Sequence, residues 1–144
     1  KGKKLSKQLL TPTKIYVKAL QPLIDKQKIK GLAHITGSGF ENVTRISKKV
    51  SYEIHLPNLQ ELPKVFEWVR THKGLSFQDL AQTFNMGLGM VLVVDPKQKT
   101  SVLRSLKRSG ESAWEVGKVV KKQNVRYSAV TVKSDLGEVA KLRG

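Results

Sequence analysis

The stretch GLAHITGSGFEN, residues 31–42, decides most of the fold that the sequence predicts. Its first half predicts a short strand over 31–36, in which Leu32, His34 and Thr36 face one way and Ala33 and Ile35 face the other. The glycine-bracketed residues 37–39 then end the strand in a tight turn, and residues 40–47 suit a short helix. Successive backbone N–H groups followed by a helix start can hold an anion. The pattern alone leaves two interpretations open, a phosphate-binding turn and a plain tight turn.

Helices and strands alternate along the chain on both sides of this stretch. Thr11-Pro12 is a favourable capping pair and predicts a helix over 11–27. The further predicted elements are strands over 50–56, 90–94, 113–120 and 125–132, helices over 62–72, after Ser76 and from Asp95-Pro96 to Gly110, and a turn over 85–89. The run 90–94 is apolar throughout, as in a central strand, and Leu62, Val65, Phe66 and Val69 form an apolar stripe that is expected to be buried. The order indicates an α+β fold with a mixed sheet covered by helices.

Composition bounds the kind of protein. A chain of 144 residues with 39% hydrophobic residues has room for one domain, over residues 1–144. The absence of cysteine excludes a disulfide scaffold, a zinc finger and a cysteine nucleophile. No apolar stretch approaches the ~20 residues that span a bilayer, so no membrane partner is expected and the location is expected to be cytoplasmic.

The net charge of +16 comes from 27 basic and 11 acidic residues. Clustered cations suit a nucleic-acid surface, whereas scattered lysines serve solubility. Of the 27 cations, 21 are lysine and 6 are arginine, although bidentate contacts to phosphates and bases favour arginine. Nucleic acid is therefore the less favoured partner.

Two segments contain candidate site residues. His34 lies in the predicted strand before the glycine turn, and a histidine there can act as an acid, a base or a phosphate ligand, although a half-buried strand histidine is the simpler interpretation. Asn85 and Gly87 lie in the second glycine turn, where Asn85 binds a ligand or closes the turn itself. The acidic residues are scattered, so no cluster suits Mg²⁺.

Four strings taken together go beyond single patterns: LLTPTKIYV at 9–17, GLAHITGSGFEN at 31–42, TFNMGLGMV at 83–91 and GESAWEVG at 110–117. In this order and spacing they resemble the C-terminal domain of the aminoimidazole ribonucleotide synthetase family, also called phosphoribosylformylglycinamidine cyclo-ligase. The resemblance covers roughly residues 5–120.

The resemblance implies a three-layer α/β/α fold with a mixed sheet, partly ferredoxin-like. It implies an ATP-dependent ring closure of formylglycinamidine ribonucleotide to aminoimidazole ribonucleotide in purine biosynthesis. It also implies that ATP and Mg²⁺ are bound mainly by an N-terminal half that is absent here, that the full enzyme is a homodimer, and that this fragment alone is inactive. The alternatives are a basic nucleic-acid-binding module and a related ATP-dependent synthetase of the same architecture.

Site roles follow from the same match, residue by residue. His34 matches a position that leads into the family's glycine turn and is the candidate catalytic residue, and no residue is assigned as a metal ligand. The matched substrate- and phosphate-binding positions are Thr11, Thr13, Thr36, Gly37, Ser38, Gly39, Asn42, Arg45, Asn85 and Gly87.

The glycine turn departs from the family pattern in two ways. Ser38 stands where the middle glycine is usual, and we expect it to be tolerated through a negative φ. One residue is also missing between Phe40 and Glu41, which puts the roles of Glu41 and Asn42 in doubt.

Overall fold

The structure is a computed structural model that describes residues 5–56, 63–122, 124 and 126–144. Its helices are α1 (Leu5–Leu9), α2 (Val17–Asp25), α3 (Lys64–Lys73), α4 (Phe77–Thr83) and α5 (Lys99–Arg108), with 3₁₀ helices η1 (Gly39–Arg45) and η3 (Pro96–Gln98). Its strands are β1 (Gly31–His34), β2 (Val50–Leu56), β3 (Met90–Val93), β4 (Gly117–Lys121), β5 (Ala129–Ser134) and β6 (Val139–Arg143).

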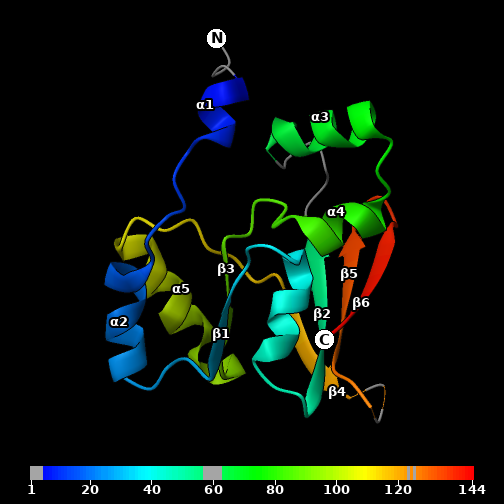
Figure 1. The fold of residues 1–144 in the computed structure, drawn as a ribbon. Helices are drawn as coiled ribbons and strands as arrows, with labels where there is room; N and C mark the ends of the chain where they lie inside the picture. The colour runs from blue at the N-terminus through cyan, green and yellow to red at the C-terminus, as the bar shows by residue number, and fades with distance from the viewer. Residues whose placement is uncertain (1–4, 57–62, 123, 125) are drawn as a thin grey trace.

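A four-stranded mixed sheet has the order β4-β2-β5-β6 (Figure 1). Strand β2 runs antiparallel to β4, with Tyr52 opposite Val119, and parallel to β5, with Tyr52 opposite Val130. Strand β6 returns antiparallel to β5. The α+β class with a mixed sheet is therefore confirmed.

Strands β1 and β3 form a separate two-stranded antiparallel ribbon, with Ala33 opposite Val91. The ribbon lies between two hydrophobic clusters, because successive side chains of a strand point to opposite faces. Ala33 and Val91 join the large core with η1, α4 and the four-stranded sheet. Leu92 packs instead with residues of α2 and α5, two helices that lie together on one side of the ribbon (Figure 1). The strand predicted over 90–94 is present as β3, but its expected central position is wrong, since among the described residues β3 pairs only with β1.

The ends of helices α4 and α5 follow their sequence signals. Ser76 and Asp79 form a capping box, and the hydrogen bonds from Ser76 lower the pKa of the Asp79 carboxyl. Asp95 Oδ1 accepts from Lys97 N at 2.8 Å and starts η3, which continues into α5. Helix α5 ends in a Schellman motif, in which Gly110 has φ +78° and Glu111 N donates to Leu106 O at 2.9 Å.

The helix predicted from Thr11 begins instead at Val17, with Tyr16 as its N-cap residue. Thr11 follows the end of α1, and its hydroxyl donates to Lys7 O at 2.7 Å. Pro12 follows directly and disfavours the helical conformation of the residue before it. Residues 11–16, which we call the threonine arm, thus connect two helices without being helical.

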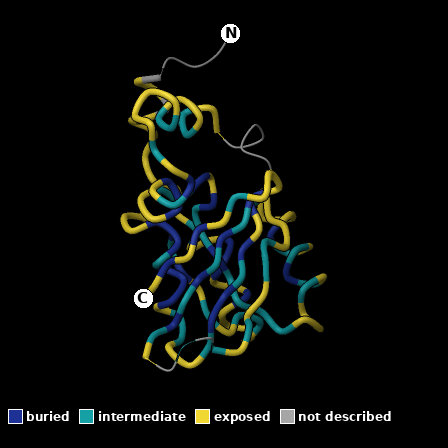
Figure 2. Tube along the Cα trace, turned by 90° about the vertical axis from the view of Figure 1, so that its right-hand side faces the viewer, coloured by how far each residue is buried: buried dark blue, intermediate teal, exposed yellow. Residues whose placement is uncertain are grey.

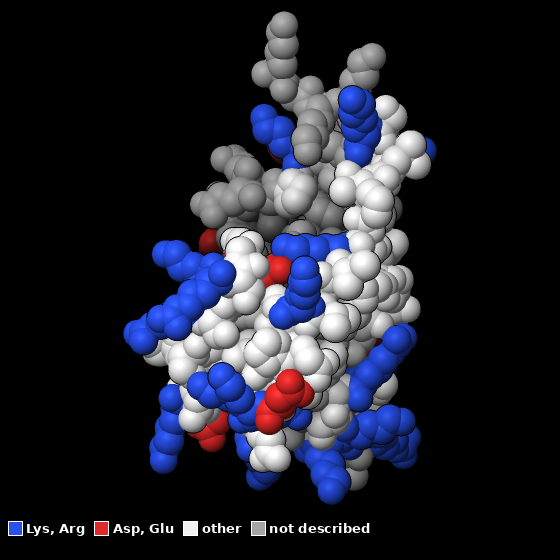
Figure 3. Space-filling view, turned by 90° about the vertical axis from the view of Figure 1, so that its left-hand side faces the viewer, with Lys and Arg blue, Asp and Glu red and all other residues white. Residues whose placement is uncertain are grey.

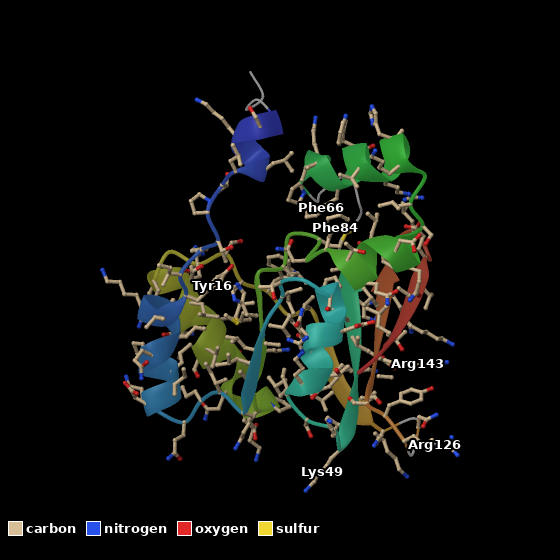
Figure 4. All side chains as sticks on the ribbon, in the orientation of Figure 1. Tyr16, Lys49, Phe66, Phe84, Arg126 and Arg143 are labelled. Atoms are coloured by element: carbon tan, nitrogen blue, oxygen red, sulfur yellow. The ribbon has the colours of Figure 1, made fainter. Side chains whose placement is uncertain are left out.

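Helix α3 has no buried residue, which corrects the prediction of a buried stripe. Val65, Phe66 and Val69 are only partly buried, and Leu62 lies outside the described residues. Phe66 reaches Phe84 after α4, with ring centroids 6.0 Å apart (Figure 4). Figure 2 shows the buried residues in the body of the molecule, away from the exposed helical segment at the top of the view.

The strands in the last third of the chain begin and end later than the sequence predicts. The strands expected over 113–120 and 125–132 lie at Gly117–Lys121 and Ala129–Ser134. Strand β6 and the short helix α1 were not predicted. No helix among the described residues is long and apolar enough to cross a membrane.

Candidate functional site

A pocket of about 330 Å³ opens where the threonine arm, the end of β1 and the turn before β3 meet. Three segments that are far apart in the sequence contribute to it. Its lining residues are Thr11, Pro12, Thr13, Lys14, Tyr16, His34, Ile35, Thr36, Asn85 and Gly89. Five of the predicted site residues are among them: Thr11, Thr13, His34, Thr36 and Asn85.

An ion pair joins the threonine arm to the segment that follows α5. Lys14 Nζ lies 2.6 Å from Glu111 Oε2, and the Lys14 side chain is 53% exposed whereas that of Glu111 is 15% exposed. Lys14 Nζ also lies 5.9 Å from the centroid of the Tyr16 ring. Thr11 and Thr13 are exposed and face the pocket from this arm.

His34 and Tyr16 form the aromatic wall of the pocket. Their ring centroids are 5.8 Å apart in an edge-to-face arrangement, and Tyr16 lies at the start of α2 (Figure 4). The Tyr16 hydroxyl lies directly against Gly89, where an added Cβ atom would overlap it. A glycine at position 89 is therefore required for Tyr16 to occupy this place.

Asn85 closes its own turn, because its Oδ1 accepts from Gly87 N at 3.0 Å. Its carboxamide therefore accepts a backbone hydrogen bond within the turn, and Asn85 also lines the pocket. Gly87 has φ +89° and lies near Pro63, but it does not line the pocket. Of the two interpretations of Asn85, turn closure is thus visible in the structure.

The glycine turn is a tight turn in which Gly39 N donates to Thr36 O at 3.1 Å. Ser38 has φ +72° and ψ +12°, which is the geometry of the third residue of a type II turn. The expectation of a negative φ at Ser38 is therefore wrong, because this turn requires the left-handed region at that residue. Gly37 and Ser38 are exposed, whereas Gly39 is buried against α4.

Asn42 has a structural contact with the same turn. It is 2% exposed, and its Nδ2 donates to Gly37 O at 2.9 Å and Gly39 O at 2.8 Å. Arg45 is exposed at the end of η1, and neither Asn42 nor Arg45 lines the pocket. The structure thus places Asn42 behind the turn, where it fixes the turn's carbonyl groups.

Replacing Ser38 with glycine is expected to raise the free energy of unfolding by about 1 kcal/mol, because a side chain in the left-handed region costs about that much. Urea denaturation of the two chains measures the difference. A loss of stability would show that the serine side chain makes a compensating contact.

Among the described residues, Lys14 is the one cation that lines the pocket. Figure 3 shows lysine and arginine spread over one face of the molecule. Strands β2 and β5 begin, and β4 and β6 end, at one end of the four-stranded sheet, which places Lys121 and Arg143 there. Lys49 and Arg126 directly precede β2 and β5 or lie close before them, at the same end (Figure 4). Lys14 at the pocket is paired with Glu111.

A second hollow of about 390 Å³ lies between β3, α5 and residues 112–119. Its walls are mostly apolar, as at Val102, Leu103 and Leu106, and no predicted site residue lines it. Among the described residues, no three His, Asp or Glu side chains come together as a metal site would require. The polar pocket is therefore the better candidate site.

Besides Pro12 and Ile35, sequence reasoning missed three residues that line the pocket, Lys14, Tyr16 and Gly89, and one residue beside it, Glu111. Each lies within or beside a string that was singled out, but its partner is distant, as with Lys14 and Glu111, which are 97 positions apart. The periodic spacing of apolar residues in a sequence does not show which distant residues come into contact. The one available signal was the glycine at 89, since a glycine before an apolar strand can mark a close approach.

Comparison with known proteins places the chain beside one family. A model described as "AIR synthase related protein, C-terminal domain" matches residues 1–129. The phosphoribosylformylglycinamidine cyclo-ligase of Caldanaerobacter subterraneus is 44% identical over 121 residues, which is 83% of this chain and 35% of that protein. The protein of the same name from Latilactobacillus sakei is 42% identical over 134 residues, which is 92% of this chain and 39% of the relative. The chain thus spans little more than a third of the length of these relatives.

Proposed function

Because the chain belongs to the AIR synthase related protein C-terminal domain family, we propose that it is the C-terminal domain of a phosphoribosylformylglycinamidine cyclo-ligase. In this role residues 1–144 act as one domain that supplies part of the site for an ATP-dependent ring closure. The substrate is formylglycinamidine ribonucleotide and the product aminoimidazole ribonucleotide. The observation that supports this most is the pocket, because three separate segments with family-like strings line it together.

The pocket suits one end of an anionic ribonucleotide. Its volume of about 330 Å³ is in the range of small-molecule sites. The hydroxyl groups of Thr11, Thr13 and Thr36 can donate to phosphate or sugar oxygens, and the exposed turn at Gly37 and Ser38 adjoins them in sequence. We assign substrate positioning to these groups.

His34 is the proposed proton acceptor. The amidine nitrogen that forms the new C–N bond must lose a proton, and a neutral imidazole within hydrogen-bond reach can accept it. His34 lines the pocket and packs against Tyr16, which restricts the orientation of its ring. His55, which is exposed on β2, has no comparable surroundings.

The residues of the pocket do not fit Mg²⁺. Mg²⁺ prefers carboxylate and phosphate oxygens, and no carboxylate is among the described residues that line the pocket. We therefore assign ATP and Mg²⁺ to the part of the enzyme that lies outside the matched segment of the relatives. A homodimer in the cytoplasm belongs to the same proposal.

Complementation tests the proposal. The 144-residue chain is mixed with the Caldanaerobacter cyclo-ligase from which the matching segment has been deleted, and phosphate release from ATP is followed with formylglycinamidine ribonucleotide present. We expect turnover in the mixture and none with either part alone. Turnover by the 144-residue chain alone would contradict the division of roles.

Absence of both turnover in the mixture and calorimetric binding of the ribonucleotide to the chain would contradict the proposed function itself. A mixture of the deleted relative with its own excised C-terminal segment serves as the positive control. It shows whether two separate parts can assemble at all.

A further inference from the structure

The threonine arm has few contacts that hold it on the body of the molecule. Thr11, Thr13 and Ile15 are exposed, and none of them is in either hydrophobic cluster. Two anchors are visible among the described residues. One is the packing of Tyr16 against Gly89 and His34, and the other is the ion pair between Lys14 and Glu111.

The position of Glu111 is fixed by the end of helix α5. Gly110 adopts φ +78° and its N–H donates to Lys107 O at 3.0 Å, while Glu111 N donates to Leu106 O at 2.9 Å. This Schellman motif directs the chain back over the last turn of the helix. Leu106 itself is buried against α2, so Glu111 is attached to a rigid part of the fold.

The two partners of the ion pair differ in what they touch. Lys14 lines the pocket, whereas Glu111 does not. The Glu111 side chain is also the more buried of the two, at 15% exposed against 53% for Lys14. The carboxylate is therefore the partner attached to the packed body of the fold, and the lysine is the partner on the exposed arm.

We propose that Glu111 is a positioning residue of the pocket, which holds the threonine arm through Lys14 so that Thr11 and Thr13 stand at the substrate. This inference rests on the proposed function for its kinetic consequence, but not for the attachment of the arm. Without the carboxylate the arm moves, the hydroxyl groups leave their places and substrate binds more weakly. The reaction of substrate already bound is unaffected, since Glu111 does not touch it.

The contrasting role is direct binding, in which the Lys14 ammonium contacts the anionic substrate and Glu111 merely neutralises it. The two roles predict opposite effects of Glu111→Gln. Release of Lys14 from its carboxylate would strengthen binding of the anion under direct contact. If the ion pair serves to hold the arm, the Glu111→Gln substitution weakens binding of the anionic substrate.

The first test measures the arm itself. Backbone ¹⁵N order parameters of residues 13–15 are recorded for the 144-residue chain and for Glu111→Gln. We expect a fall from about 0.85, typical of rigid backbone, to below about 0.6. Glu115→Gln is the matched control, because Lys99 and Glu115 form an ion pair of the same 2.6 Å length that does not involve the arm.

The second test measures the complemented enzyme. Glu111→Gln is expected to raise KM for the ribonucleotide up to about fivefold, the most that an exposed pair is normally worth, with kcat within twofold of the parent chain. The double variant Lys14→Glu with Glu111→Lys re-forms the pair with its charges exchanged. It is expected to restore both the order parameters and KM.

Unchanged order parameters in Glu111→Gln would overturn the inference. So would a double variant that restores the order parameters while KM stays high, because Lys14 would then act on the substrate directly. If the parent chain neither supports turnover nor binds the ribonucleotide in the calorimeter, the proposed function is contradicted instead. The order parameters still decide whether Glu111 holds the arm.

Discussion

Replacing His34 with glutamine is expected to lower kcat of the complemented enzyme by about 10²- to 10⁴-fold, the usual contribution of a general acid or base. Glutamine keeps much of the size and the hydrogen-bonding capacity of histidine, but it cannot take up a proton near neutral pH. His34 lines the pocket beside Tyr16, so a replacement of similar size should leave the wall in place. The measurement is the rate of ring closure at saturating ribonucleotide.

His55→Gln is the matched control, since this histidine is exposed on the four-stranded sheet and does not line the pocket. It is expected to retain the parent kcat. If His34→Gln raises KM while kcat stays within about threefold, His34 binds substrate without moving a proton. Equal urea denaturation curves for the two variants exclude a general loss of structure.

Replacing Gly39 with alanine is expected to lower the free energy of unfolding by about 3 kcal/mol, a large share of the roughly 5–15 kcal/mol that stabilises a typical domain. Two effects combine. Gly39 has φ +49°, which a side chain disfavours, and an added Cβ atom would overlap the backbone oxygen of Ala81. Helix α4 would have to separate from η1.

Gly37→Ala is the matched control in the same turn. Gly37 does not have a positive φ, and an added Cβ atom would have no heavy atom within 4 Å. Urea denaturation should therefore show less than about 1 kcal/mol of change for this variant. A Gly39→Ala chain as stable as Gly37→Ala would contradict the close contact between η1 and α4.

The sequence predicted elements well wherever a local signal decided the structure. The alternation over 50–56 predicted strand β2 with its bounds, and Ser76 began helix α4 through the capping box. Thr11-Pro12 shows where local signals fail. The same pair that can start a helix stands here after the end of α1, and the contacts of Lys14 and Tyr16 with distant residues keep the arm out of helix α2.

The site was predictable only where local sequence signals define it. The glycine turn was identified, but the sign of φ at Ser38 depends on the turn type, which a serine does not reveal. The role of Asn42 was also hidden, because an asparagine that fixes a turn and one that binds a ligand look the same in a sequence. The pairing of Lys14 with Glu111 depends on how α2 packs against α5, which is a property of the whole fold.

The ribbon of β1 and β3 separates two hydrophobic clusters. This separation limits which substitutions in the ribbon the protein can accept during evolution. Val91 borders the sheet core, whereas its neighbour Leu92 borders α2 and α5. A change of volume at Val91 must be compensated among residues such as Ala33, and one at Leu92 among residues such as Leu20. Adjacent positions of one strand should therefore accumulate substitutions as members of two separate groups.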